Sequence, residues 1–240
     1  MNERAENRLE TVQSLDELNS LLIDCRLCPR LVLWREEVAR VRRRAYRDQV
    51  YWGRPIPGFG DPHARLLIFG LAPAAHGGNR TGRVFTGDSS GNFLYAALHR
   101  AGFANQPIAT DVNDGLQLQD AYIAATCRCA PPDNKPTREE MDTCRPYFLR
   151  ELQLLHNLEG IVALGKIAFD NILLGLRQLG RPAVPSPAEL RFGHNRWYDL
   201  GQGRPWLLAS YHPSQQNTQT GRLTVDMFDE VWQQARQRLG

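Results

Sequence analysis

Four side chains in glycine- or proline-rich parts of the sequence have the chemistry to bind or cleave a planar ligand. Asp88, in FTGD, could orient a water molecule or stabilise a developing cation. Phe85 could stack on a flat ligand, and Asn134, in PPDNKP, offers a donor and an acceptor to a heterocycle. His212 could donate to an anion or a carbonyl oxygen. Each has a structural alternative: a helix cap, a core aromatic, a turn asparagine and a hydrogen-bonded histidine.

Five cysteines include one closely spaced pair. Cys25 and Cys28 form a C-x-x-C motif, in which two thiolates can grip one metal ion or one edge of a cluster. Cys129 and Cys144 could complete a four-thiolate site, and buried unreactive thiols are the alternative. The N-terminal stretch carries charges of both signs and no apolar core, so we expect a cytoplasmic protein without a membrane partner. In that compartment a disulfide framework is not favoured.

The positive charge is concentrated near the N-terminus. Residues 26–54 contain nine arginines and three acids, a local balance of +6 in a chain whose net charge is +3. Such a cluster suits a polyanion such as nucleic acid, and a solvated helix face is the alternative. Lysine is scarce, because Lys135 and Lys166 are the only two in the chain.

The elements that must position these residues alternate along the chain. Apolar segments at 65–69, 121–127, 160–164 and 206–210 lack polar alternation, which is typical of parallel strands covered on both faces. Helical patterns separate them and predict an α/β fold with a mostly parallel sheet. Further helices are expected at the N-terminus, where Ser14 caps a helix that leads to Cys25 and a second helix runs from Arg30 to about Arg44. Segments 51–61 and 104–118 are typical of loops, and 190–199 has no clear pattern.

Three of the predicted strand ends carry polar loops. The longest, from Gly70 to Asn92, contains six glycines, which let the backbone approach a ligand closely. Loops of this length are usually functional, although a plain surface connection is the alternative. Because ligands of such sheets bind at the carboxyl ends of the strands, the three loops predict one shared site.

Three long motifs resemble one known family. The segments GLAPAAHGGNRTGRVFTGDSSG, RCAPPDNKPT and YHPSQQNTQTGRLT, with Cys25-x-x-Cys28-Pro29-Arg30 before them, closely resemble the family 5 (type b) uracil-DNA glycosylases over about residues 20 to 235. The resemblance implies a central four-stranded parallel sheet flanked by helices. It also implies one domain over residues 1–240, with its N-terminal helices tied in by a four-iron, four-sulfur cluster. The cysteines that match the cluster ligands are Cys25, Cys28, Cys129 and Cys144, and Cys127 lies outside the pattern.

The resemblance also implies roles for the site residues. Asp88 matches the catalytic aspartate, and Phe85 would stack on a base that is flipped out of the helix. His212 would stabilise the departing uracil anion, and Asn134 matches a site asparagine. The backbone from Gly70 to Ala74, including Gly70 and Ala72, would line the pocket. We further expect Arg80, Gln216 and Asn217 to contact DNA.

The resemblance further implies a reaction and a range of substrates. We expect monofunctional hydrolysis of the N-glycosidic bond in base excision repair, leaving an abasic site, by a protein that acts as a monomer on DNA. A lyase would need an amine, for which Lys135 is the one candidate near the site. Ala125 stands where related uracil glycosylases have a base-reading asparagine, which fits other deaminated bases as well as uracil. A DNA-binding module without activity and a zinc protein with a phosphate site are the alternatives.

Overall fold

A central β-sheet organises the computed structural model, which describes residues 8–180, 184–186 and 188–240. Within these residues the sheet has six strands in the order β1-β3-β2-β4-β6-β5. Their bounds are β1 Phe59–Gly60, β2 Leu66–Gly70, β3 Ala121–Ala125, β4 Gly160–Leu164, β5 Arg196–Tyr198 and β6 Trp206–Ser210. The inner strands β3, β2, β4 and β6 pair in parallel, as the apolar segments predict.

The prediction of a sheet with four parallel strands was incomplete. Short strands β1 and β5 add to the two edges, and both pair antiparallel with their neighbours. β1 is two residues long and lies inside the glycine- and proline-rich segment 51–61 that resembles a loop. β5 has three residues, too few to show an alternating pattern. The sheet is therefore mixed, with a parallel centre.

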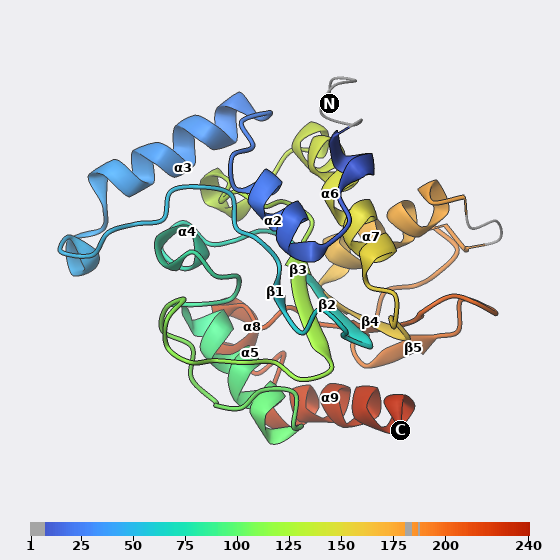
Figure 1. Ribbon diagram of the computed structural model, residues 1–240. Helices are drawn as coiled ribbons and strands as arrows, with labels where there is room; N and C mark the ends of the chain where they lie inside the picture. Colours follow the sequence, from blue (N-terminus) through green and yellow to red (C-terminus); the bar gives the residue numbers. More distant parts are fainter. Residues whose placement is uncertain (1–7, 181–183, 187) are drawn as a thin grey trace.

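Helices cover both faces of the sheet, so the protein has three layers (Figure 1). Alternate strand residues divide between two apolar clusters: Leu67, Phe69 and Ala163 pack on one side, and Leu66, Ile68 and Val162 on the other. The first cluster includes residues of α2 (Leu15–Leu22), α6 (Arg138–Leu154) and α7 (Lys166–Gln178), and the second includes residues of α5 (Ser89–Arg100) and α9 (Val225–Leu239). Burial on both faces explains why the inner strands lack polar alternation.

Side-chain caps define several of the helix starts. Ser14 accepts from the N–H of Glu17 at the start of α2, and Thr137 forms a capping box with Glu140 at the start of α6. Both caps confirm the predicted helix starts. The helix α3 (Pro29–Val41) ends three residues before the predicted limit, and the short 3₁₀ helix η1 (Arg44–Tyr46) follows it.

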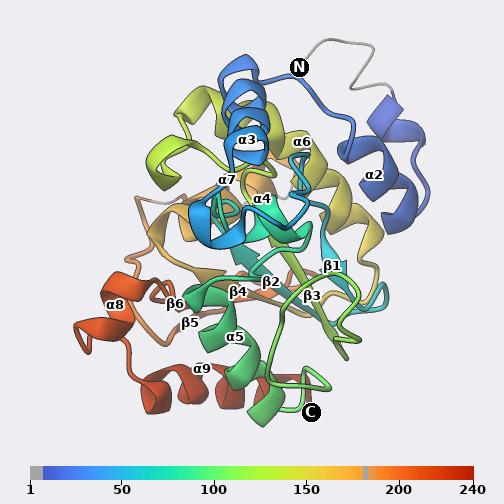
Figure 2. The same cartoon turned by 90° about the vertical axis from the view of Figure 1, so that its left-hand side faces the viewer.

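The long loop after β2 contains more structure than its sequence predicts. A short helix, α4 (Gly78–Thr81), lies inside it, and α5 begins at Ser89 instead of Phe93. Figure 2 shows this loop, α5 and α8 (Gln215–Gln219) near the carboxyl ends of the parallel strands. None of the described helices is both long and apolar enough to cross a membrane.

Candidate active site

A cleft of about 460 Å³ opens where β2, β3 and β6 end. Its volume lies in the range of small-molecule sites. The predicted residues that line it are Ala72, Phe85, Asp88, Asn134, His212 and Gln216. Gly70 and Ala125 are register partners at the ends of β2 and β3, which explains how loops far apart in the sequence meet at this edge. The structure therefore brings the predicted loops into one site.

Asp88 both caps a helix and lines the cleft. Its Oδ1 accepts the N–H of Gly91 at 2.9 Å, which fixes the first turn of α5. Its Oδ2 lies against Gly77, where any Cβ would overlap with the carboxylate. Burial raises the pKa of Asp88, and the backbone N–H groups of Gly91 and Ser90 partly offset this rise. The cap and the chemical role predicted from the sequence are thus compatible.

Phe85 has a left-handed backbone conformation, with φ of 50°. This conformation is strained for a bulky residue, and such strain is concentrated at functional sites. The ring packs over Gly70, where an added Cβ would lie 2.9 Å from Phe85 Cζ. Its centroid lies 5.8 Å from that of the His212 ring, with 32° between the planes. One aromatic wall of the cleft therefore consists of two neighbouring rings.

His212 presents an uncharged imidazole to the cleft. Burial lowers the pKa of His212 to about 4, so the ring is neutral at neutral pH. Asn217 donates from Nδ2 to the His212 carbonyl at 2.8 Å, which holds the backbone of this residue. Within the described residues the ring itself has no hydrogen-bond partner, which leaves its N–H for a ligand.

Asn134 lies in a tight turn that lines the cleft. It ends the 3₁₀ helix η2 (Pro132–Asn134), and its φ of 56° is one that asparagine tolerates better than most residues. Its exposed side chain has no hydrogen bond to the described part of the chain. Ala125 also lines the cleft and offers no polar group there. Asn134 therefore forms part of the turn, and its side-chain amide is still available to a ligand.

Three predicted site residues lie behind the cleft instead of lining it. Gly70 supports the Phe85 ring, and Asn217 secures His212. Arg80 donates to the carbonyl oxygens of His76 at 2.8 Å and Gly87 at 2.9 Å. These contacts give the three residues structural roles, and the expected DNA contacts of Arg80 and Asn217 stay predictions.

Other residues at the site escaped the sequence analysis. Ser90 and Ser214 line the cleft, and Gly77 makes room for Asp88. The glycine pair at 77–78 was the one available signal, because a glycine pair often marks a close approach of the backbone. Ser90 lies in the first turn of α5 and Ser214 caps the short helix α8, so both resemble ordinary helix-start residues in the sequence.

A buried ion pair supports the Phe85 segment from behind. Arg83 donates to Asp114 at 2.9 and 2.5 Å, and both side chains are almost fully buried. Arg83 also donates from Nε to Thr86 Oγ1 at 3.0 Å. Arg83 and Thr86 flank Phe85, and Arg83 holds this part of the chain against the segment 104–118. The sequence of that segment is typical of a loop.

The four cysteines of the predicted cluster site line a second, separate cavity. Cys25, Cys28, Cys129 and Cys144 come from the end of α2, the start of α3, the loop after β3 and α6. Cys127 is fully buried and is not part of this lining. In the described chain, no three His, Cys, Asp or Glu side chains are arranged to hold a single metal ion. The thiols surround a space instead of one point.

Two buried arginines give this cavity a cationic wall. Arg35 donates from Nη1 to Cys129 Sγ at 2.8 Å, and Arg128 forms a buried ion pair with Glu151. Arg35 Nε and the Nε and Nη1 atoms of Arg128 are buried without a partner among the described residues. Unpaired buried donors favour an anionic occupant. Four thiolates around an iron–sulfur core would be such an occupant, so the residues present fit the cluster.

Known proteins match this chain over most of its length. The family model described as the uracil DNA glycosylase superfamily matches residues 57–236. A protein of Mycobacterium bovis named type-5 uracil-DNA glycosylase is 54% identical over 228 residues, which cover 95% of this chain and 82% of the relative. Relatives of the same name from Mycobacterium leprae and Thermus thermophilus are each 53% identical, over 95% and 91% of this chain and 96% and 95% of their own. The chain therefore belongs to the uracil DNA glycosylase superfamily.

Proposed function

We propose that the protein is a monofunctional uracil-DNA glycosylase of base excision repair. The observation that carries this proposal is the meeting of Phe85, Asp88, Asn134 and His212 in one cleft of a chain that is 54% identical to a type-5 uracil-DNA glycosylase. A base in duplex DNA is stacked, so the enzyme must flip the nucleotide into this cleft before it can hydrolyse the N-glycosidic bond. The products are free base and an abasic site.

Each of the cleft residues has a different role in cleavage of the N-glycosidic bond. Phe85 stacks on the flipped base, and Asn134 offers its free amide to the edge of the base. The Asp88 carboxylate lies close to the sugar, where it stabilises an oxocarbenium-like charge or positions the attacking water. The neutral His212 ring donates its N–H to a carbonyl oxygen of uracil, which leaves as an anion. Charge thus develops against groups that are already in place.

The lysines favour hydrolysis over lyase chemistry. Lys166 bonds to Asp170 at 2.6 Å, and Lys135 is not among the residues that line the cleft. An amine that forms a Schiff base with the sugar would need to reach the reacting carbon. Borohydride trapping is therefore expected to give no covalent enzyme–DNA product, and a trapped product would contradict monofunctional hydrolysis.

Ala125 supports a range of bases wider than uracil. Ala125 lines the cleft, and its side chain can neither donate nor accept a hydrogen bond. A site without a polar reader at this position discriminates weakly between bases that differ in their polar edges. We expect release of hypoxanthine as well as uracil, and oligonucleotides with a single lesion of each kind measure the ratio of the two rates.

The cysteine cavity completes the proposal with a four-iron, four-sulfur cluster held by Cys25, Cys28, Cys129 and Cys144. Hydrolysis of a glycosidic bond needs no electron transfer, so the cluster supplies structure. Bound there, it would join α2 and α3 to the segment that follows β3. A brown protein with iron and sulfide supports this cofactor, and a colourless protein with bound zinc overturns it.

The substitution Asp88→Asn tests the central claim. Asparagine is as good an N-cap as aspartate, so the variant keeps the start of α5 while it removes the negative charge. Release of uracil from a single-lesion oligonucleotide is expected to fall about 100-fold or more, with little change in duplex binding and melting temperature. If the unaltered protein binds DNA but releases no base, the chain is a binding module and the proposal fails.

A further inference from the structure

The arginines of the basic N-terminal segment fall into two groups. Most of those between residues 26 and 54 have internal partners. Ion pairs join Arg26 to Glu36, Arg30 to Glu140, Arg40 to Glu37 and Arg54 to Asp24. Arg35 is buried against Cys129, and Arg42 donates to the carbonyl oxygens of Ala39 and Arg47. The helix α3 thus uses its own arginines for structure, despite its basic sequence.

Three arginines of this segment are unpaired. Arg43, Arg44 and Arg47 are exposed, and their guanidinium groups have no ion pair or hydrogen bond within the described residues. They surround η1, at the far end of α3, which projects from the body of the molecule (Figure 1). Asp48 is the one acid between residues 42 and 50. We call residues 43–47 the arginine turn.

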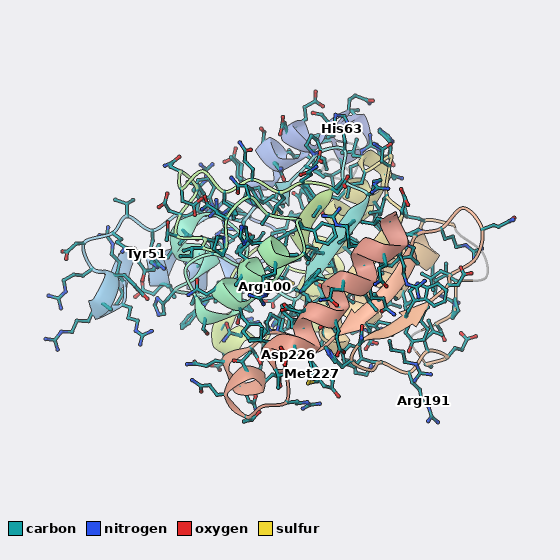
Figure 3. The ribbon with its side chains drawn as sticks, turned by 90° about the horizontal axis from the view of Figure 1, so that it is seen from below. Tyr51, His63, Arg100, Arg191, Asp226 and Met227 are labelled. Carbon is teal, nitrogen blue, oxygen red and sulfur yellow. The ribbon has the colours of Figure 1, made fainter. Side chains whose placement is uncertain are left out.

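The arginine turn contacts the loop from Gly70 to Asn92, which we call the active-site loop. Tyr46 lies under the Arg80 guanidinium at 4.1 Å from its ring centroid, and Gln49 accepts from Arg80 at 2.6 Å. Tyr51 bonds to the Nδ1 of His76 at 3.1 Å, and Figure 3 shows Tyr51 beside the projecting end of the molecule. Arg80 and His76 of the active-site loop therefore hold the turn and the residues that follow it. These contacts fix the position of the turn relative to the site.

A groove lies between the cleft and Tyr46, the residue of the arginine turn that lines it. Tyr46, Gln49 and Val50 line one part of it, and Asp88 and Ser89 line another. Asp88 and Ser89 also line the base cleft, so the two depressions adjoin. A nucleotide flipped into the cleft must leave its own backbone near Asp88. The strand that continues from it can then follow the groove toward the three free cations.

We propose that the arginine turn binds the phosphate backbone of the DNA strand that flanks the flipped nucleotide. Guanidinium groups match phosphate oxygens in geometry, and three unpaired ones on a turn whose Tyr46 lines the groove can bind successive phosphates. The paired arginines of α3 contribute little, because their carboxylate partners neutralise them. This assignment rests on the proposed glycosylase activity and names the part of the protein that holds the DNA.

The dependence of binding on salt tests the arginine turn. The triple variant Arg43→Gln, Arg44→Gln, Arg47→Gln is compared with Arg26→Gln, Arg40→Gln, Arg138→Gln, which removes the same charge from exposed residues that have carboxylate partners. Both sets are made in an Asp88→Asn background, so that a 20-base-pair duplex with one uracil survives the measurement. The slope of log affinity against log salt is expected to become shallower by about 2.7 in the turn variant and by less than one in the control.

The outcomes separate the two proposals. Equal slopes for the turn variant and the control would show that net charge alone matters, which overturns the role of the turn. If the turn variant does not fold, the single variant Arg44→Gln replaces it, with an expected slope change of about 0.9. Failure of the proposed function is seen separately, because the protein with Asp88 intact would then release no uracil from the same duplex.

Discussion

Single residues at this site have a structural role and also line the cleft. Asp88 caps α5 and lines the cleft, and Asn134 occupies a left-handed turn while its amide stays free. The sequence left these roles as alternatives, because a motif shows which groups are present but not how many contacts each one makes. The structure places a helix cap or a turn and the lining of the cleft on the same residues. A polar side chain whose backbone is fixed by its own turn or helix is held in place before a ligand arrives.

The pKa of His212 predicts a pH dependence of stability. It lies near 4 in the folded protein, below the usual value of 6.5, so the unfolded chain binds this proton more readily. The contribution of His212 is therefore complete above pH 6.5 and is lost as pH falls toward 4, by at most about 3 kcal/mol. In urea unfolding between pH 7.5 and 4.5, His212→Gln is expected to lose free energy of unfolding less steeply than the unaltered protein.

An exposed histidine provides the control for this experiment. His63→Gln removes an imidazole from the surface, where Figure 3 shows His63 near the outer edge of the molecule. Its free energy of unfolding should follow that of the unaltered protein across the range. A His212→Gln curve that runs parallel to the unaltered one would show that burial does not keep this ring neutral.

At the scale of elements, two loops depend on each other. The segment 104–118 has the composition of a connection, yet its Asp114 is held by Arg83 of the active-site loop. Burial alone would raise the pKa of Asp114, but the Arg83 guanidinium and the backbone N–H groups of Leu116 and Thr110 hold it well below its usual range. The convergence of the strand ends could be predicted, because the carboxyl ends of parallel strands lie on the same side of a sheet. The pairing of Arg83 with Asp114 could not be predicted, since it depends on packing between segments that are distant in the sequence.

The substitution Arg83→Lys tests whether this pair positions Phe85. Lysine keeps the charge but loses the two-pronged contact with Asp114 and the bond to Thr86. We expect a loss of about 1–3 kcal/mol in stability, because donors and acceptors remain buried without partners. We also expect uracil release to fall, since the strained Phe85 backbone is no longer held on both sides. Urea unfolding and the kcat and KM of base release measure the two effects.

A second arginine–aspartate pair is the matched control. Arg100, labelled in Figure 3, also donates two hydrogen bonds to one aspartate, from Nε and Nη2 to Asp229 at 2.8 and 2.6 Å, but this pair is more exposed and joins α5 to α9. Arg100→Lys is expected to change stability by less than about 1 kcal/mol and to leave base release unchanged. If Arg83→Lys lowers stability without changing base release, the buried pair serves the fold and has no part in positioning Phe85.

At the scale of the whole molecule, one segment connects the two sites. Residues from β3 to α6 contribute Ala125 and Asn134 to the cleft and Cys129 and Cys144 to the thiol cavity. The sequence predicted both residue sets through motif resemblance, and it predicted the inner strands through apolar runs. The buried arginines of the cavity could not be foreseen, because arginine is almost never fully buried and nothing local marks the exceptions. Their unpaired buried donors support the proposal of an anionic occupant.

The loss of that occupant is expected to lower the stability of the fold. A cluster would link Cys25 and Cys28 to Cys129 and Cys144. It would close loops of about 100 residues and restrict the unfolded chain. Without it, the unpaired donors of Arg35 and Arg128 face an empty space, which adds a penalty. Cys144→Ser should lose iron and melt at a lower temperature, while Cys127→Ala, which removes a thiol outside the cavity, should keep its iron. Melting that is unchanged by removal of iron from the unaltered protein would contradict a structural cluster.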